Sequence, residues 1–308
     1  MRKELKKVFS FAYRLITSAL PEQSHLLVLY FHKVYTSKSE AFNGCSHPME
    51  ATTAEDLKII IGTLLENGYQ FVNPESIFSI RANSNPRLAL ITFDDGYFNN
   101  TRALPILEQF NVPCLFHVST WYIAEQRPFW VDVLYRQMRQ YGKKLEQIAD
   151  AIELMKKLSL PEIISRIGRE AMYIDSDICR PFTCQELKDF ARHKLVYIGN
   201  HTHTHAALAL QDRDAIQKEL SISQELLKEW LGSYPQSIAY PHGSVNALVM
   251  EMARQIGFRV GFTVEPMKNY LPFKNPLFLH RFSFSDDGDL ATICRRIINY
   301  RNSHGMLH

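Results

Sequence analysis

Cysteine is scarce in this chain of 308 residues, and its spacing is not that of a metal or redox motif. The cysteines are Cys45, Cys114, Cys179, Cys184 and Cys294. Their number is odd and no two form a C-x-x-C pair, which excludes a zinc knuckle and a redox centre of that type. A bond between Cys179 and Cys184 is the alternative, but the scatter favours reduced thiols and therefore a reducing compartment.

The sequence also lacks a long apolar run and a strong excess of charge. No apolar run is long enough to cross a bilayer. The formal net charge is +3 at pH 7, and no basic tail or aromatic RNA motif is present. We therefore expect no nucleic-acid partner.

Residues 1–22 begin like a secretory signal peptide, but Arg14 interrupts the apolar run and no A-x-A-like cleavage site follows. Apolar residues with a helical period and several basic residues predict a basic amphipathic helix. Such a helix either lies on an anionic membrane surface as a peripheral anchor or packs against its own domain. We expect a cytoplasmic protein, at the inner face of the membrane in the first case, with export as the alternative.

Short runs rich in Val, Ile, Phe and Tyr predict seven strands, at 26–31, 88–93, 113–119, 195–200, 237–240, 260–264 and 277–284. Amphipathic helical stretches lie between them, such as those that end before Gly68 and Gly232. This alternation predicts an α/β fold with a parallel sheet, and a closed barrel fits seven doubly buried strands better than an open sheet. Residues 133–192 lack a strand pattern and are expected to form a helical insertion in a single domain, 23–308.

Two adjacent carboxylates, Asp94 and Asp95, follow the predicted strand at 88–93 and precede Gly96. The carboxyl ends of parallel strands are where catalytic groups sit in such folds. Adjacent carboxylates repel each other unless a cation or a shared proton relieves the repulsion, and their roles then diverge. The alternative, a solvated turn, needs no second acid, so we expect one carboxylate to bind metal and its neighbour to take protons.

Three histidines occupy alternate positions in 201–205, directly after the strand predicted at 195–200. In an extended segment, His201 and His205 would be about 13 Å apart, too far to share a metal ion. A helical turn would place these two on one face and point His203 elsewhere. We therefore predict His201 and His205 as metal ligands. Two histidines and one carboxylate leave positions open for water, as in hydrolytic sites.

Together, Thr92-Phe93-Asp94-Asp95-Gly96 and the 201–205 segment resemble the motifs of polysaccharide deacetylases of carbohydrate esterase family 4. The resemblance covers most of residues 25–285 and implies a distorted (β/α) barrel. It also implies that Asp94 is the general base and that Asp95, His201 and His205 bind the metal.

The third motif of that family, R-x-P-[aromatic]-G, is only partly present in the segment 239–243. Ala239 stands in the position of the arginine that holds the base, and His242 in that of the aromatic residue. We hypothesise that Arg281 replaces the missing arginine. The rest of the segment is expected to bind substrate, through Tyr240, Pro241, His242 and Gly243.

The family's L-x-x-H motif supplies the general acid, and the sequence contains two copies, ending at His32 and His280. One branch of the family carries this histidine near the N-terminus in a Y-H-x-V setting, which resembles Tyr30 to Val34. We therefore predict His32 as the acid, with His280 as the rival. The segment 128–132 resembles a W-x-D element of the same branch, in which Trp130 either stacks on a sugar or fills the core.

The resemblance implies a metal-dependent hydrolase that removes the acetyl group from an N-acetylhexosamine in a polysaccharide or glycolipid. The ligands suit Zn²⁺ best, although Co²⁺, Ni²⁺ and Fe²⁺ accept the same set. Two alternatives remain: an amidohydrolase of a non-sugar amide or imide, and an inactive carbohydrate-binding relative, which the absent arginine at Ala239 would explain. Neither the glycan nor the oligomeric state follows from the sequence.

Overall fold

The structure is a computed structural model, and it describes residues 23–80, 87–284 and 289–302. The basic amphipathic helix predicted for residues 1–22 lies outside these ranges. Within them, no helix combines the length and the apolar character that crossing a membrane requires.

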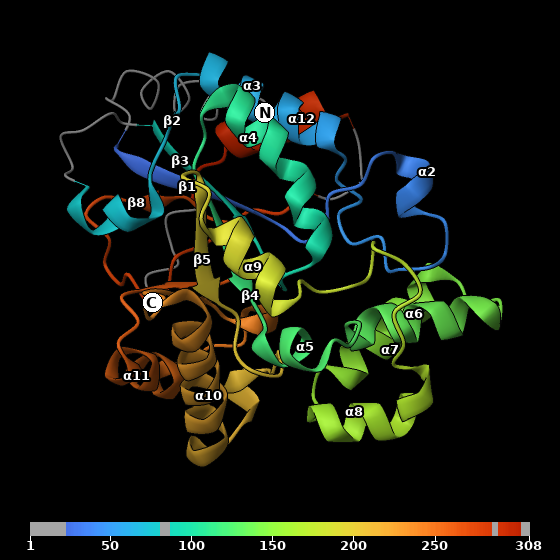
Figure 1. Cartoon of the computed structure of the whole chain (residues 1–308). Coiled ribbons are helices and arrows are strands. Elements are labelled where there is room, and N and C mark those ends of the chain that lie inside the picture. The colour runs from blue at the N-terminus through green and yellow to red at the C-terminus, as the bar shows by residue number, and fades with distance from the viewer. Residues whose placement is uncertain (1–22, 81–86, 285–288, 303–308) are drawn as a thin grey trace, which may run out of the picture.

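The centre of the molecule is a curled, mostly parallel sheet (Figure 1). The strand order is β7-β6-β5-β4-β3-β1-β8, and β2 also pairs with β3. All these pairs are parallel except β8 with β1. The strands are β1 (His25–Phe31), β2 (Gln70–Phe71), β3 (Arg87–Phe93), β4 (Cys114–Val118), β5 (Val196–Asn200), β6 (Ser237–Ala239), β7 (Val260–Phe262) and β8 (Asn269–Tyr270).

The predicted strand at 277–284 is wrong as a continuous strand. It forms two isolated parallel bridges instead, Leu279 with Phe262 of β7 and Phe282 with Leu29 of β1. The backbone changes partner within four residues, because Leu279 exchanges hydrogen bonds with β7 and Phe282 with β1. The segment therefore connects the two sides of the sheet, and Arg281 lies between the two bridges.

Strands β1, β3 and β4 are buried on both faces, which is why they read as nearly continuous apolar runs. Leu27 and Leu29 belong to the larger core, between the sheet and the surrounding helices. Leu26 and Val28 belong to a second hydrophobic cluster, on the inner face of the sheet. Helices outside the 130–172 segment are α2 (Lys38–Ala41), α3 (Ala54–Glu66), α4 (Leu104–Phe110), α5 (Thr120–Glu125), α9 (Cys184–Ala191), α10 (Arg213–Leu231), α11 (Ala247–Ile256) and α12 (Leu290–Ile298).

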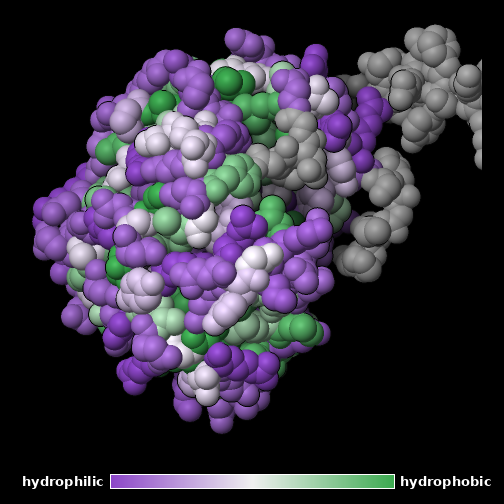
Figure 2. Space-filling view, turned by 90° about the vertical axis from the view of Figure 1, so that its right-hand side faces the viewer, coloured by the Kyte–Doolittle hydropathy of each residue, from purple (hydrophilic) through white to green (hydrophobic). Residues whose placement is uncertain are grey.

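Helices α6 (Trp130–Gln140), α7 (Leu145–Met155) and α8 (Leu160–Ile167) form a group at one side of the barrel (Figure 1). They share a hydrophobic cluster separate from the main core. The predicted insertion 133–192 also includes helix α9. Leu187 and Phe190 of α9 pack into the main core, however, and not into the cluster that α6, α7 and α8 share. The face of the molecule that carries α6 and α8 is mostly hydrophilic (Figure 2). The division into domains stays a prediction.

Candidate active site

A tight turn at Asp95 and Gly96 follows β3 and directs the carboxylates of Asp94 and Asp95 to different places. Asp95 has φ +76° and Gly96 φ +91°, a backbone region that glycine adopts readily and aspartate rarely. A Cβ on Gly96 would lie 2.9 Å from Cβ of Val118. The turn therefore packs so closely against β4 that only glycine fits here. The turn lets Asp94 and Asp95, both almost fully buried, face different partners.

The histidine segment 201–205 is not the helical turn that the sequence analysis expected. It is a loop in which Thr202 and His205 have positive φ angles, +64° and +61°. Hydrogen bonds to side chains hold the loop in this conformation. Asn200 Oδ1 accepts from the backbone N–H of Thr202, and a Glu219 carboxylate oxygen accepts from the N–H groups of residues 203 and 204. These contacts draw the ends of the segment together without a helix.

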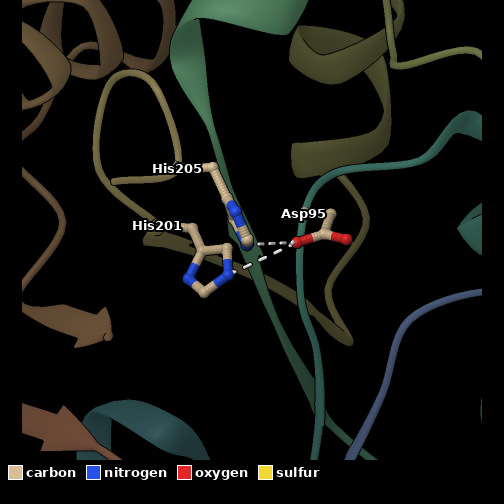
Figure 3. A group of neighbouring side chains, drawn as sticks. All are labelled: Asp95, His201 and His205. Atoms are coloured by element: carbon tan, nitrogen blue, oxygen red, sulfur yellow. Dashed lines mark ion pairs between the residues drawn. The ribbon is translucent and has the colours of Figure 1, made fainter. Parts of the chain in front are cut away.

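The loop brings His201 and His205 to Asp95, so that their rings and the carboxylate point toward one another (Figure 3). The Nε2 atoms of His201 and His205 lie 3.4 and 3.2 Å from Asp95 Oδ1. His203 instead pairs its Nδ1 with the hydroxyl of Thr120, at 2.9 Å. The structure therefore assembles the three predicted ligands and leaves His203 outside the group.

The chemistry of the three groups fits a divalent metal ion. Their ligand atoms all lie within 4.8 Å of one another. His201 Nδ1 donates to the carbonyl of Ala239, at 2.7 Å, which leaves the Nε2 lone pair facing Asp95, the arrangement that metal-binding histidines commonly show. Among the described residues, buried Asp95 Oδ1 has no hydrogen-bond partner. A cation in this place would satisfy it.

The charges around the triad favour the ionised form of Asp95. Burial raises the pKa of this carboxyl, but the neighbouring His205 and His201 outweigh burial and hold the pKa well below its ordinary value. Burial in turn lowers the pKa of His205, although Asp95 opposes this. An ionised carboxylate beside a neutral imidazole is the protonation state in which both groups bind metal.

Asp94 pairs with Arg281, the residue hypothesised to replace the missing motif arginine. The guanidinium donates from Nη1 to Oδ1 at 2.8 Å and from Nη2 to Oδ2 at 2.7 Å, and its Nε donates to the carbonyl of Thr263. Arg281 is fully buried. Burial raises the pKa of Asp94, but Arg281 reverses this and holds the pKa well below its ordinary value. The carboxylate is thus fixed in orientation and ionised.

His117 is a site residue that the sequence analysis missed, because it belongs to no motif. It points from β4 to Asp94, with Nδ1 3.3 Å from Oδ1, and is fully buried. Burial lowers its pKa to about 4 although Asp94 raises it. Gly199 on the next strand leaves room for the ring, since a Cβ there would lie 2.3 Å from His117 Cδ2. No signal in the sequence marks this residue, because the pairing of His117 with Gly199 is known only from the folded sheet.

His32 lies at the end of β1 and pairs with Glu50, a second residue that the sequence did not reveal. Its Nδ1 lies 2.9 and 3.0 Å from the two carboxylate oxygens. Burial lowers the pKa of His32, but Glu50 outweighs burial and raises it to about 9. His280, the rival, lies beside Glu265 at 3.5 Å, and its pKa is lowered by burial. His32 is therefore the protonated histidine of the two at neutral pH.

A buried ion pair fixes the loop that follows His32. Lys33 Nζ donates to Asp132 Oδ1 at 2.6 Å, and both side chains are fully buried. Tyr97 donates to the other oxygen of Asp132, and the N–H of His47 donates to Oδ1. The W-x-D element noted in the sequence thus ends in a carboxylate that joins helix α6 to the loop carrying Glu50.

One cavity of about 340 Å³ contains these groups. His32, Asp94, Asp95, His201, His205, Trp130 and His242 all line it. The other residues predicted to bind substrate do not line it: Tyr240 is fully buried and donates to the carbonyl of Leu277, Pro241 is buried, and Gly243 lies against Val264. The 239–243 segment therefore turns only His242 to the cavity, where its ring centroid is 4.6 Å from that of His205.

Two relatives in sequence carry the same name, poly-beta-1,6-N-acetyl-D-glucosamine N-deacetylase. The one from Escherichia coli strain K12 is 23% identical over 233 residues, which cover 66% of this chain and 29% of that protein. The one from Staphylococcus aureus strain MRSA252 is 25% identical over 150 residues, which cover 45% of this chain and 50% of that protein. The chain thus spans half of these relatives or less.

Two solved structures share the fold. IcaB from Ammonifex degensii has a TM-score of 0.59 at 19% identity, with 90% of this chain and 98% of that chain covered. The Streptococcus pyogenes deacetylase PplD in complex with acetate has a TM-score of 0.61 at 16% identity, with 89% and 99% covered. The predicted α/β fold, a distorted barrel of mostly parallel strands, is confirmed.

The sequence pattern of one family matches more than half of the chain. This family is described as polysaccharide deacetylase, and the match extends over residues 81–261. These residues include both of the motifs that carried the resemblance, at 92–96 and 201–205. The chain therefore belongs to the polysaccharide deacetylase family.

Proposed function

We propose that this protein is a metal-dependent hydrolase that removes the acetyl group from an N-acetylhexosamine of a glycan or glycolipid and releases acetate. The observation that carries this proposal is the content of one cavity. It combines the triad of Asp95, His201 and His205 with an ionised Asp94 and a protonated His32. These are the groups that amide hydrolysis requires: a metal site, a base and an acid.

Asp95, His201 and His205 would hold the ion, and two imidazoles with one carboxylate suit Zn²⁺, while Co²⁺, Ni²⁺ and Fe²⁺ accept the same ligands. When bound, such an ion polarises a carbonyl group and lowers the pKa of water. The chain itself keeps the histidines oriented through the carbonyl of Ala239 and the loop contacts of Glu219.

Asp94 would take a proton from the attacking water as its oxygen adds to the amide carbonyl. Arg281 keeps this carboxylate ionised and pointed, so that no reorientation is needed at that moment. An amine leaves poorly until it is protonated. His32 would donate a proton to the nitrogen as the C–N bond breaks, giving acetate and a free amine. Glu50 keeps His32 protonated for this step.

The proposal is tested by measuring acetate release from a panel of N-acetylated glycans after removal of metal and after addition of zinc. We expect release that a chelator abolishes and zinc restores. Full activity of a metal-free preparation contradicts the proposed metal dependence. Release from non-sugar amides or imides alone would favour the amidohydrolase alternative, and binding of glycans without release would favour the inactive relative.

A further inference from the structure

The cavity that contains the triad has a wall which the barrel does not supply. Helix α7, from the group α6–α8, lines it with Ala149, Ile152 and Glu153, and Lys156 follows at its end. Ile152 is 7% exposed and packs in one cluster with Trp130 of α6. Ile152 thus attaches this side of the cavity to the rest of the fold, and Glu153 lies exposed at its edge.

The wall faces the loops at the ends of the strands. Lys156 and His242 line the same cavity, although they come from α7 and from the loop after β6. Lys156 also forms an ion pair with Glu153. The end of α7 and the loop after β6 thus both border the site.

The enclosed volume is small. At about 340 Å³, the cavity is at the lower end of the roughly 300 to 1,000 Å³ typical of small-molecule sites. That is room for one sugar ring with its acetamide group. A polymer bound through an internal sugar must leave the site in two directions, and α7 lines one side of the cavity.

We propose that the group deacetylated here is a terminal N-acetylhexosamine, which enters the cavity end-on, and that internal sugars of a long chain are poor substrates. This inference rests on the proposed function and narrows its substrate class. The apolar side chains of Phe129, Trp130 and Ile152 would contact the faces of that one ring, and the remainder of the glycan would extend from the open side.

The test uses the full chain loaded with zinc and a β-linked N-acetylglucosamine pentasaccharide with a label on its reducing end. Tandem mass spectrometry locates the first free amine. We expect it on one end sugar roughly tenfold or more faster than on the three internal sugars. Equal or faster reaction at internal sugars overturns this inference and leaves the proposed function standing. Absence of acetate from both the pentasaccharide and a simple N-acetylglucosamine glycoside counts against the proposed function itself.

Variants of α7 test whether this helix is the reason that internal sugars react poorly. Glu153→Ala/Lys156→Ala removes the two long side chains at the edge of the cavity, and should lower the ratio of end to internal products roughly threefold or more. The matched control is Leu154→Ala/Lys157→Ala, since both of those side chains are exposed and neither lines the cavity. An unchanged ratio in the first variant shows that α7 is not the barrier and overturns the inference.

Discussion

Arg281 and Asp94 form a two-pronged ion pair inside the molecule, with hydrogen bonds of 2.8 and 2.7 Å between residues 187 positions apart. Such a planar contact fixes the direction of the carboxylate as well as its charge. The family motif places its arginine elsewhere, at the position of Ala239 in this chain. The pair therefore makes the role of Arg281 testable by substitution.

Arg281→Lys should lower kcat/KM by about 10² or more, because a lysine keeps the charge but not the two-pronged contact. Since the guanidinium holds the pKa of Asp94 down, the acid limb of the pH–rate profile should move to higher pH. Steady-state kinetics across pH measure both effects. Arg192→Ala, at an exposed arginine, is the control. Unchanged turnover in Arg281→Lys would show that this arginine does not serve the base.

Glu50→Gln should move the basic limb of the pH–rate profile to lower pH. His32 with a pKa of about 9 is protonated at neutral pH and loses its proton as the pH rises through 9. Without the Glu50 charge, less opposes the effect of burial, so the pKa of His32 should fall and the rate at pH 8 should fall with it. Activity measured from pH 6 to 10 checks this. A limb that stays near 9 contradicts the assignment.

His32→Ala should abolish acetate release, whereas His280→Ala should retain most of it. The reason is position: His32 lines the cavity with Asp94 and Asp95, and His280 lies beside Glu265. The two variants are compared by kcat at pH 7 with zinc bound. The reverse pattern would transfer the role of acid to His280.

His201→Ala should lose most of its bound metal and its activity, whereas His203→Ala should keep the metal content of the parent protein. Both substitutions remove an imidazole from the same loop, but only His201 faces Asp95. Elemental analysis of the purified proteins gives the metal content directly. Equal loss in both variants would mean that the loop, and not the triad, is responsible.

Gly199→Ala and Gly62→Ala should change stability in opposite directions. A Cβ at Gly199 would meet His117 at 2.3 Å and Ser237 Oγ at 2.6 Å, and overpacking of this kind costs roughly 1 to 3 kcal/mol. Gly62 lies within α3 with open space at its Cβ, so alanine there should add up to about 1 kcal/mol. Thermal unfolding of both variants measures the difference. A stable and fully active Gly199→Ala would argue against a close fit around His117.

The strands and the triad were largely predictable from the sequence, because both depend on local pattern. Of the seven strands predicted from apolar runs, six are present in the structure. Motif spacing selected the three candidate ligands. The loop geometry at 201–205 was not predictable, since it depends on Asn200 and on Glu219 from α10. Likewise, the contacts of His117 and Glu50 come from segments that meet only in the folded chain, where sequence spacing carries no information.

Two isolated bridges attach residues 277–284 to β7 and to β1, and this segment also carries a side chain of the candidate active site. Arg281 lies between the two bridges and extends inward to Asp94, so the same short segment attaches to both sides of the sheet and holds the carboxylate of Asp94. If these bridges opened, Asp95, His201 and His205 could stay together, whereas Asp94 would lose its contact with Arg281. The attachment of residues 277–284 to the sheet is therefore expected to matter for the orientation of Asp94 more than for the arrangement of the three candidate ligands.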